Sequence, residues 1–237
     1  MLAMREHGVQ DYAVLPDMDA TDVGVLAADD RSCLEELGRY LAGADAWQRF
    51  GIWLLHKHFD PDQDELFLER TSTMPRWAQT SPELKSAFGE TEVVTTSIRF
   101  DPSASSGVGL VGMEFATSPE FGDVSPFNHD DAAVLAGIAE RLAFHGKLDR
   151  FGVRLIRNPL SLNDQELLNE TCDRENRRLQ YHVRDRDALL SDKTTIQTAW
   201  RWRVLDGDTE PLVMMDCTLT CAQTAEGHDA SVIHDAY

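Results

Sequence analysis

The stretch Arg49-Phe50-Gly51-Ile52-Trp53-Leu54-Leu55 recurs 101 residues later as Arg150-Phe151-Gly152-Val153-Arg154-Leu155-Ile156. Around it, Asp30 to Thr71 aligns with Asp131 to Cys172 without a gap, and 11 of the 42 aligned pairs are identical. The register resumes at an offset of 102 for residues 96–100 and 110–114. An internal repeat of this kind predicts two copies of one unit packed with pseudo-two-fold symmetry. Residues peculiar to one copy are then better candidates for function than residues shared by both.

Each copy of the repeat predicts the same succession of elements. Leu34, Leu37 and Leu41 recur at helical spacing, which predicts an amphipathic helix at the start of the copy. Branched and aromatic residues after it predict strands, and Ser81-Pro82 is typical of a helix start. The predicted elements of the first copy are a helix over 33–41, a hairpin of 50–55 with 65–69, a short helix from Ser81, and a hairpin of 93–100 with 110–116.

We therefore predict an α+β fold of two tandem pseudo-two-fold repeats, each a helix, a β-hairpin, a short helix and a β-hairpin, packed as one compact unit. The predicted boundaries are an N-terminal extension over 1–29, repeat 1 over 30–117, repeat 2 over 131–219 and a C-terminal tail over 220–237.

The chain is strongly acidic, with 41 Asp and Glu against 22 Lys and Arg and a formal net charge of −19. Such a surface repels a phosphate backbone, so we expect no direct binding to nucleic acid. The same charge suits neutralisation of a cationic molecule, which leaves a basic protein partner as an alternative.

The hydropathy pattern predicts a soluble protein. No segment offers the roughly 18 uncharged apolar residues that a membrane span needs, so we expect no membrane insertion. The first seven residues lack the apolar stretch of a secretory signal, which predicts a cytoplasmic location. In that compartment the cysteines are expected to be reduced.

His56-Lys57-His58 is the strongest chemical motif of the sequence. Alternate residues of a strand share a face, and two imidazoles about 6–7 Å apart at Cα commonly share one metal ion. The second copy has Arg157 and Pro159 at the matching positions, so the fold does not require histidine there. Two exposed histidines at the end of a hairpin remain the alternative interpretation.

Acidic residues close to the two histidines can complete a metal site. We predict Asp62 as the third ligand, with Glu65 and Glu69 as carboxylates that act in catalysis. Two histidines and one carboxylate suit Fe(II), and a fourth ligand or a water suits zinc, so either divalent metal is a candidate cofactor. Glu65 and Glu69 recur as Glu166 and Glu170, which equally fits an ordinary ion-paired strand face.

Two further motifs are not supported by their context. Cys217, Cys221, His228 and His234 have the composition of a zinc site, but four residues of extended chain put the two cysteines about 13 Å apart. The Gly-x-Gly-x-x-Gly run at 107–112 lies in a predicted strand and not before a helix, so no nucleotide cofactor is expected.

These observations favour a metal-dependent enzyme, or a ligand-binding protein, that acts on a small molecule through a His-x-His site in repeat 1. The alternative is a non-catalytic acidic interaction protein, such as an immunity, inhibitor or regulatory factor, that binds a basic partner. The alternative predicts exposed His56 and His58 and no metal.

Overall fold

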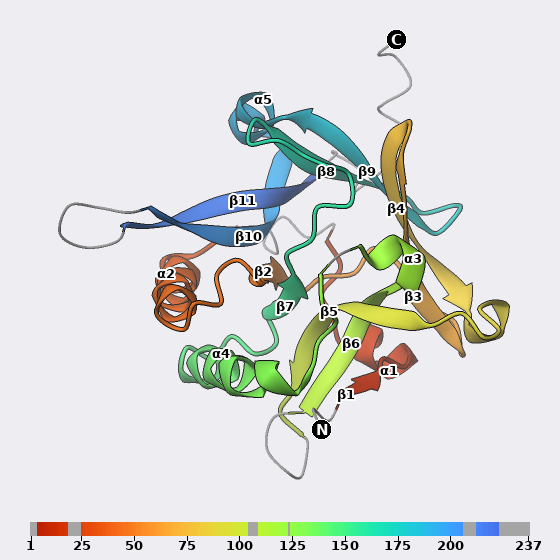
Figure 1. The fold of residues 1–237 in the computed structure, drawn as a ribbon, viewed down its shortest axis with the longest axis horizontal. Helices are drawn as coiled ribbons and strands as arrows, with labels where there is room; N and C mark the ends of the chain where they lie inside the picture. The colour runs from red at the N-terminus through yellow and green to blue at the C-terminus, as the bar shows by residue number, and fades with distance from the viewer. Residues whose placement is uncertain (1–3, 19–24, 104–108, 123, 206–211, 223–237) are drawn as a thin grey trace.

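The computed structural model describes residues 4–18, 25–103, 109–122, 124–205 and 212–222 (Figure 1). The described strands are β1 (Met4–Glu6), β2 (Phe50–Leu54), β3 (Glu65–Thr73), β4 (Arg76–Leu84), β5 (Val93–Asp101), β6 (Gly109–Thr117), β7 (Phe151–Leu155), β8 (Glu166–Asp173), β9 (Arg178–Asp185), β10 (Thr195–Leu205) and β11 (Leu212–Ala222). The described helices are α1 (Val9–Ala13), α2 (Ala28–Gly43), η1 (Lys85–Ala87), α3 (Ser118–Phe121), η2 (His129–Asp131), α4 (Ala132–Phe144) and α5 (Arg186–Ser191).

Within these residues, the strands form a closed barrel. Ten strands follow one another in the hydrogen-bonded order β6-β3-β4-β9-β8-β11-β10-β2-β7-β5, and β5 pairs with β6 to close the ring. The short strand β1 adds to β6 in parallel. The predicted α+β fold of helix–hairpin repeats is therefore wrong. Ring closure satisfies the hydrogen-bonding edges that two open hairpin sheets would leave unpaired.

The first predicted hairpin does not form, because β2 and β3 do not pair with each other. β2 pairs with β7 and β10, while β3 pairs with β4 and β6. All five residues of β2 are buried, so this strand needs neighbours on both edges and cover on both faces. Pairing with its own repeat counterpart supplies one edge, with Ile52 opposite Val153.

The predicted helix start at Ser81-Pro82 is also wrong, because both residues belong to β4. Pro82 lies opposite Phe67 of β3, whereas the pairing of β4 with β9 ends at Thr80. A proline that lacks an N–H donor is tolerated there because it occupies a locally unpaired edge. Only the single turn η1 remains of the expected helix.

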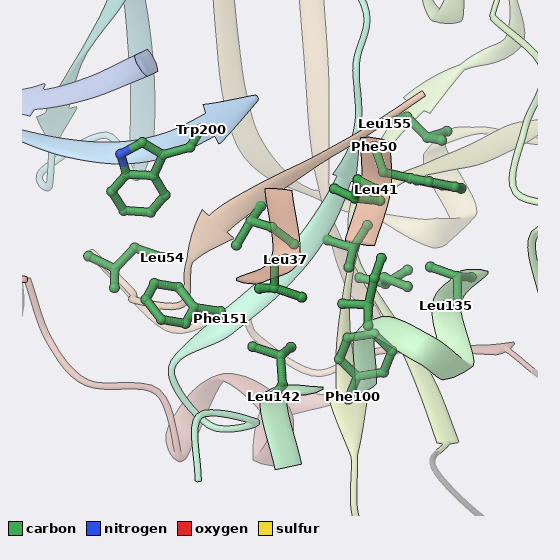
Figure 2. Close-up of a cluster of buried hydrophobic side chains, with 14 of the residues drawn as sticks. Leu37, Leu41, Phe50, Leu54, Phe100, Leu135, Leu142, Phe151, Leu155 and Trp200 are labelled. Atoms are coloured by element: carbon green, nitrogen blue, oxygen red, sulfur yellow. The ribbon is translucent and has the colours of Figure 1, made fainter. Parts of the chain in front are cut away.

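Helices α2 and α4 lie side by side against the outside of β2 and β7 and enclose the larger apolar core (Figures 1 and 2). Phe50 and Leu54 of β2 pack into this core together with Leu37 of α2 and Leu142 of α4. Trp53 points the opposite way, into a second cluster inside the barrel. Alternation along the strand thus separates an outer core from an interior.

None of the helices in the described part of the chain is long and apolar enough to cross a membrane.

Two glycines of the repeated Phe-Gly motif make room inside the barrel. Gly152 lies opposite Trp53, and a Cβ on Gly152 would lie 2.3 Å from the Trp53 Nε1. Gly51 lies opposite Arg154, and a Cβ on Gly51 would lie 2.8 Å from the carbonyl oxygen of Trp200. The glycine of the repeated motif is therefore explained by close approach of neighbouring atoms in both copies.

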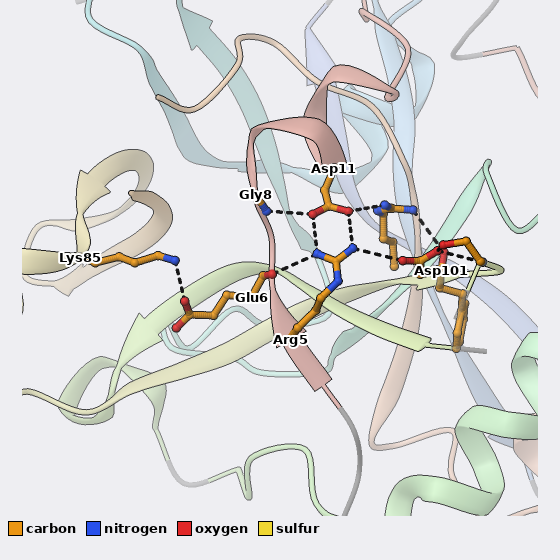
Figure 3. A network of polar contacts seen from close by, with 9 residues as sticks. Arg5, Glu6, Gly8, Asp11, Lys85 and Asp101 are labelled. Atoms are coloured by element: carbon orange, nitrogen blue, oxygen red, sulfur yellow. Dashed lines mark hydrogen bonds and ion pairs between the residues drawn. The ribbon is translucent and has the colours of Figure 1, made fainter. Parts of the chain in front are cut away.

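An ion-pair network fastens the N-terminal segment to the barrel (Figure 3). The Asp11 carboxylate is buried and accepts hydrogen bonds from Arg5 and Arg99, as well as from the backbone N–H of Gly8. Arg5 also reaches Asp101 at 3.1 Å. Burial favours the neutral acid, but the two guanidinium groups and the Gly8 N–H outweigh it and hold the Asp11 pKa well below its usual range. The network thus ties β1 and α1 to β5.

Candidate metal centre

Four side chains that commonly bind metal ions meet in the structure: His56, His58, Glu170 and Cys221. One ligand atom of each lies within 4.8 Å of those of the other three. All four residues are buried, with exposures of 7% or less. The two histidines come from the segment after β2, Glu170 from β8 and Cys221 from β11, and these three segments are far apart in the sequence.

The backbone around Lys57 positions the two histidines. Strand β2 ends at Leu54, but the Lys57 N–H donates to the Pro16 carbonyl and the Met18 N–H donates to the Lys57 carbonyl. This bridge keeps the segment extended, so His56 and His58 lie on one side with their ring centroids 4.9 Å apart. The His-x-His spacing thus brings two imidazoles together, as the sequence predicts.

Strand pairing positions the other two side chains. β8 and β11 run parallel, and Cys221 lies in register with Glu170. Residues in register on neighbouring strands present their side chains to the same face. The Cys221 thiol donates to the Glu170 Oε1 at 2.7 Å.

The separations of the four ligand atoms suit a small tetrahedral ion. The two histidine Nε2 atoms are 3.1 Å apart, and Glu170 Oε1 lies 2.8 Å from the His58 Nε2 and 3.7 Å from the His56 Nε2. Cys221 Sγ lies 3.6 Å and 3.9 Å from the Nε2 atoms of His58 and His56. Zinc bonds of about 2.0–2.3 Å place tetrahedral ligand atoms about 3.3–3.6 Å apart. Small side-chain movements would therefore accommodate the ion.

A backbone carbonyl fixes the ring of His56. The His56 Nδ1 lies 2.8 Å from the Leu54 carbonyl oxygen, which can only accept a hydrogen bond. Nδ1 must therefore carry the proton, and in the neutral ring Nε2 keeps its lone pair toward the other three side chains. Second-shell contacts of this kind orient histidine ligands in metal sites.

The protonation states of the group are set by its burial. Burial alone would raise the pKa of Glu170, but the adjacent imidazoles of His58 and His56 hold it well below its usual range. Burial lowers the pKa of His58 and outweighs the attraction of Glu170, so this ring favours the neutral form. Burial and the Glu170 carboxylate raise the pKa of the Cys221 thiol well above its usual value. Glu170 thus favours the carboxylate form that binds metal, whereas the His58 Nε2, which donates to Glu170, and the Cys221 thiol must each release a proton to become ligand atoms.

A small cavity of about 30 Å³ borders three of the four residues, His56, His58 and Glu170. Glu114 and Arg154 also line it. A space of this size holds a water molecule or two, and polar groups surround it. The cavity therefore offers room for a solvent ligand beside the cluster.

The acids predicted from the sequence lie outside this group of four. The Asp62 side chain is 81% exposed and pairs with Arg177 at 3.2 Å. Glu65 accepts from the same arginine at 2.7 Å. Glu69 is buried in an ion pair with Arg157. The structure does not bring Asp62, Glu65 and Glu69 together with the histidines, and their assigned roles stay predictions.

The surroundings of Glu69 can be compared with those of Glu170, its counterpart in the second copy of the repeat. At the repeat offset of 101, Glu69 corresponds to Glu170 and Arg157 corresponds to His56. The Glu69 carboxylate is neutralised by the Arg157 guanidinium. At the other site the buried Glu170 carboxylate faces two imidazoles and a thiol. Glu69 is thus paired with the permanent positive charge of Arg157, whereas Glu170 is surrounded by side chains that could bind a metal cation.

Sequence reasoning missed Glu170 and Cys221 as members of the cluster. A glutamate shared by both copies indicates an ordinary strand face at Glu170, and the spacing of Cys221 associates it only with Cys217 and the tail histidines. Cys217 packs separately with Leu167 and Leu189, and it is not one of the four clustered side chains. The other two residues of that zinc set, His228 and His234, lie outside the described residues.

No protein-family model matches the chain, and neither the curated proteins nor the solved structures contain a significant match. The function must therefore be argued from the site itself.

Proposed function

We propose that this protein binds one divalent transition-metal ion, zinc in the first place, through the Nε2 atoms of His56 and His58, a Glu170 carboxylate oxygen and the Cys221 Sγ. The observation that supports this most is the contrast between the repeat-related sites. A buried carboxylate without a positive charge is unfavourable, and Arg157 supplies that charge to Glu69. A bound cation would supply it to Glu170.

The donor set favours zinc over harder ions. Thiolate and imidazole ligands suit Zn²⁺, whereas Ca²⁺ and Mg²⁺ require oxygen ligands. Four protein ligands also complete the tetrahedral shell that is typical of structural zinc. The proposed ion therefore cross-links the segment after β2 to β8 and β11 and stabilises the barrel.

Titration of metal-free protein with Zn²⁺ and Co²⁺ tests this proposal. We expect binding of one ion per chain, a rise in the melting temperature, and a thiolate-to-cobalt absorption band that disappears in Cys221→Ala. Asp62→Asn is the matched control, because Asp62 is exposed and pairs with Arg177. Binding that persists in His58→Ala and Cys221→Ala but is lost in Asp62→Asn would contradict the ligand set.

A catalytic role at the same ion is the second candidate. The cavity beside His56, His58 and Glu170 favours it, because a metal-bound water there would be a reactive nucleophile. Azide added to the cobalt protein discriminates the two roles. A shift of the visible spectrum indicates an open coordination position, as catalysis needs, whereas an unchanged spectrum indicates a closed structural site.

The alternative of an acidic interaction protein receives no support from the two histidines. It predicts exposed His56 and His58, but both are buried. Binding of a basic partner by the acidic surface stays a prediction, which a pull-down with cationic proteins at physiological salt would test.

A further inference from the structure

A second, larger pocket of about 130 Å³ lies inside the barrel wall next to the segment that follows β7. Its walls are mostly apolar and include Leu160, Leu168 and Tyr181. Arg154 lines this pocket and also the small cavity beside the metal cluster. A charged group in an apolar pocket is the usual arrangement of a small-molecule site.

Arg154 owes its inward position to the alternation of β7. Its neighbours Val153 and Leu155 pack in the outer core with α2 and α4. Arg154 is the repeat counterpart of Trp53, which packs in the interior cluster. Opposite Arg154, Gly51 presents no side chain, and a Cβ there would lie 2.8 Å from the Trp200 carbonyl oxygen. The second copy thus places a cation that lines the pocket where the first copy has a large aromatic side chain.

The other charged groups around the pocket are already paired. Arg157 is neutralised by Glu69, and Arg201 lies 3.3 Å from Asp216. Across the described parts of the chain, Arg154 makes no side-chain hydrogen bond or ion pair.

Buried acids affect the charge of Arg154 without forming a hydrogen bond to it. Burial alone would lower the pKa of Arg154. The attraction of Glu114 and Glu69 is larger and raises this pKa, so the guanidinium stays charged. Glu114 itself accepts a hydrogen bond from Ser97, and burial raises its pKa toward the neutral form. Arg154 is therefore a permanent cation with unused donors.

We propose that this pocket binds a small organic carboxylate, with its carboxylate on the Arg154 guanidinium and its apolar body against Leu160, Leu168 and Tyr181. The guanidinium fork matches a carboxylate in a bidentate pair. An engineered apolar cavity of about 150 Å³ holds benzene, so a pocket of this volume suits a compound with one ring or a short branched chain. The proposal does not depend on a metal in the neighbouring cluster.

Calorimetric titration with benzoate and its uncharged isostere benzamide tests this pocket. We expect saturable benzoate binding tighter than about 1 mM to wild type, and at least about tenfold weaker binding of benzamide, because the charge-assisted hydrogen bonds are lost. Arg154→Gln should weaken benzoate by a similar factor. Arg178→Gln is the matched control, since Arg178 is exposed on β9 and does not line the pocket.

The proposal would be overturned by no saturable benzoate binding to wild type, by equal affinities for benzoate and benzamide, or by unchanged benzoate binding in Arg154→Gln. If Arg154→Gln does not fold, the comparison of the two compounds on wild type decides. Metal-free wild type should bind benzoate as the untreated protein does. Loss of binding on metal removal would instead place the carboxylate on the ion and contradict the role of Arg154.

Discussion

His56 and Arg157 occupy equivalent positions in the two copies of the repeat, and each lies beside the buried glutamate of the other copy. Arg157 pairs with Glu69, while the His56 Nε2 lies 3.7 Å from Glu170. The repeat thus provides an internal comparison between a carboxylate that is neutralised by an arginine and one that is surrounded by side chains that could bind a metal ion. Arg157 balances the buried charge of Glu69, and a bound cation would do the same for Glu170.

His56→Arg should convert the metal centre into a copy of the second site. We expect the variant to fold, to lose metal binding, and to resist unfolding by chelators, because the guanidinium pairs with Glu170 as Arg157 pairs with Glu69. Chemical denaturation with and without EDTA measures the effect. His56→Ala is the comparison and should be less stable than His56→Arg, since it supplies no positive charge to the buried Glu170 carboxylate, which keeps only the hydrogen bonds from His58 and Cys221. Equal stability of the two variants would contradict the charge argument.

Zinc affinity should increase with pH. The raised pKa of the Cys221 thiol means that binding releases its proton, so the apparent affinity should rise about tenfold per pH unit around neutrality. Competition with a calibrated chelator between pH 6 and pH 8 measures the slope. Cys221→Ala should flatten it, whereas an unchanged slope in that variant would exclude the thiol as the source of the proton.

Gly38→Ala should destabilise the protein even though alanine is the better helix former. Gly38 lies in α2 against Trp202, and a Cβ there would lie 2.1 Å from the Trp202 Nε1. We expect a loss of about 1–3 kcal/mol from overpacking. Gly43 at the end of the same helix has no atom within 4 Å of its added Cβ, so Gly43→Ala should be neutral or stabilising. Urea unfolding compares the two, and a stabilised Gly38→Ala would disprove the contact.

His7 should make the fold sensitive to acid. Its ring is buried against Tyr12, and burial, with some help from Lys85, lowers the pKa to about 4. The unfolded chain binds the proton near pH 6.5, so this contribution to stability is complete above pH 6.5 and is lost as the pH falls toward 4. The loss amounts to about 3 kcal/mol.

Unfolding free energies at several pH values test the role of His7. His7→Leu should reduce the loss between pH 6.5 and pH 4 relative to wild type. The exposed His129 supplies the control, since His129→Leu should leave the pH dependence unchanged. Identical curves for wild type and His7→Leu would contradict the assignment.

Local sequence signals predicted several elements correctly but not their pairing. The helical spacing of Leu34, Leu37 and Leu41 lies within α2, and the Phe50 stretch forms β2. The pairing of β2 with β7 joins residues about 100 positions apart, and no local turn signal specifies it. Short turn sequences predict hairpins between strands that are neighbours in the chain. The closed ring depends on pairing between strands of different copies, which such turns do not indicate.

The sequence predicts two of the four clustered side chains, because only those two lie close together in the chain. His56 and His58 are neighbours in the chain, so their spacing alone brings the rings together. Glu170 and Cys221 meet through the parallel pairing of β8 and β11, which the sequence does not reveal. The preference for residues peculiar to one copy selected the histidines but discounted Glu170. The two copies differ in the residue beside this glutamate: Arg157 lies beside Glu69, and His56 lies beside Glu170.

Elemental analysis of the purified, tag-free protein beside His56→Arg would show whether the cluster of His56, His58, Glu170 and Cys221 holds a metal ion. We expect one zinc or other divalent transition-metal ion per wild-type chain and none in a folded His56→Arg protein. Wild-type protein that stays metal-free after reconstitution with zinc, cobalt and iron would contradict this expectation, and so would a folded variant that retains the full stoichiometry.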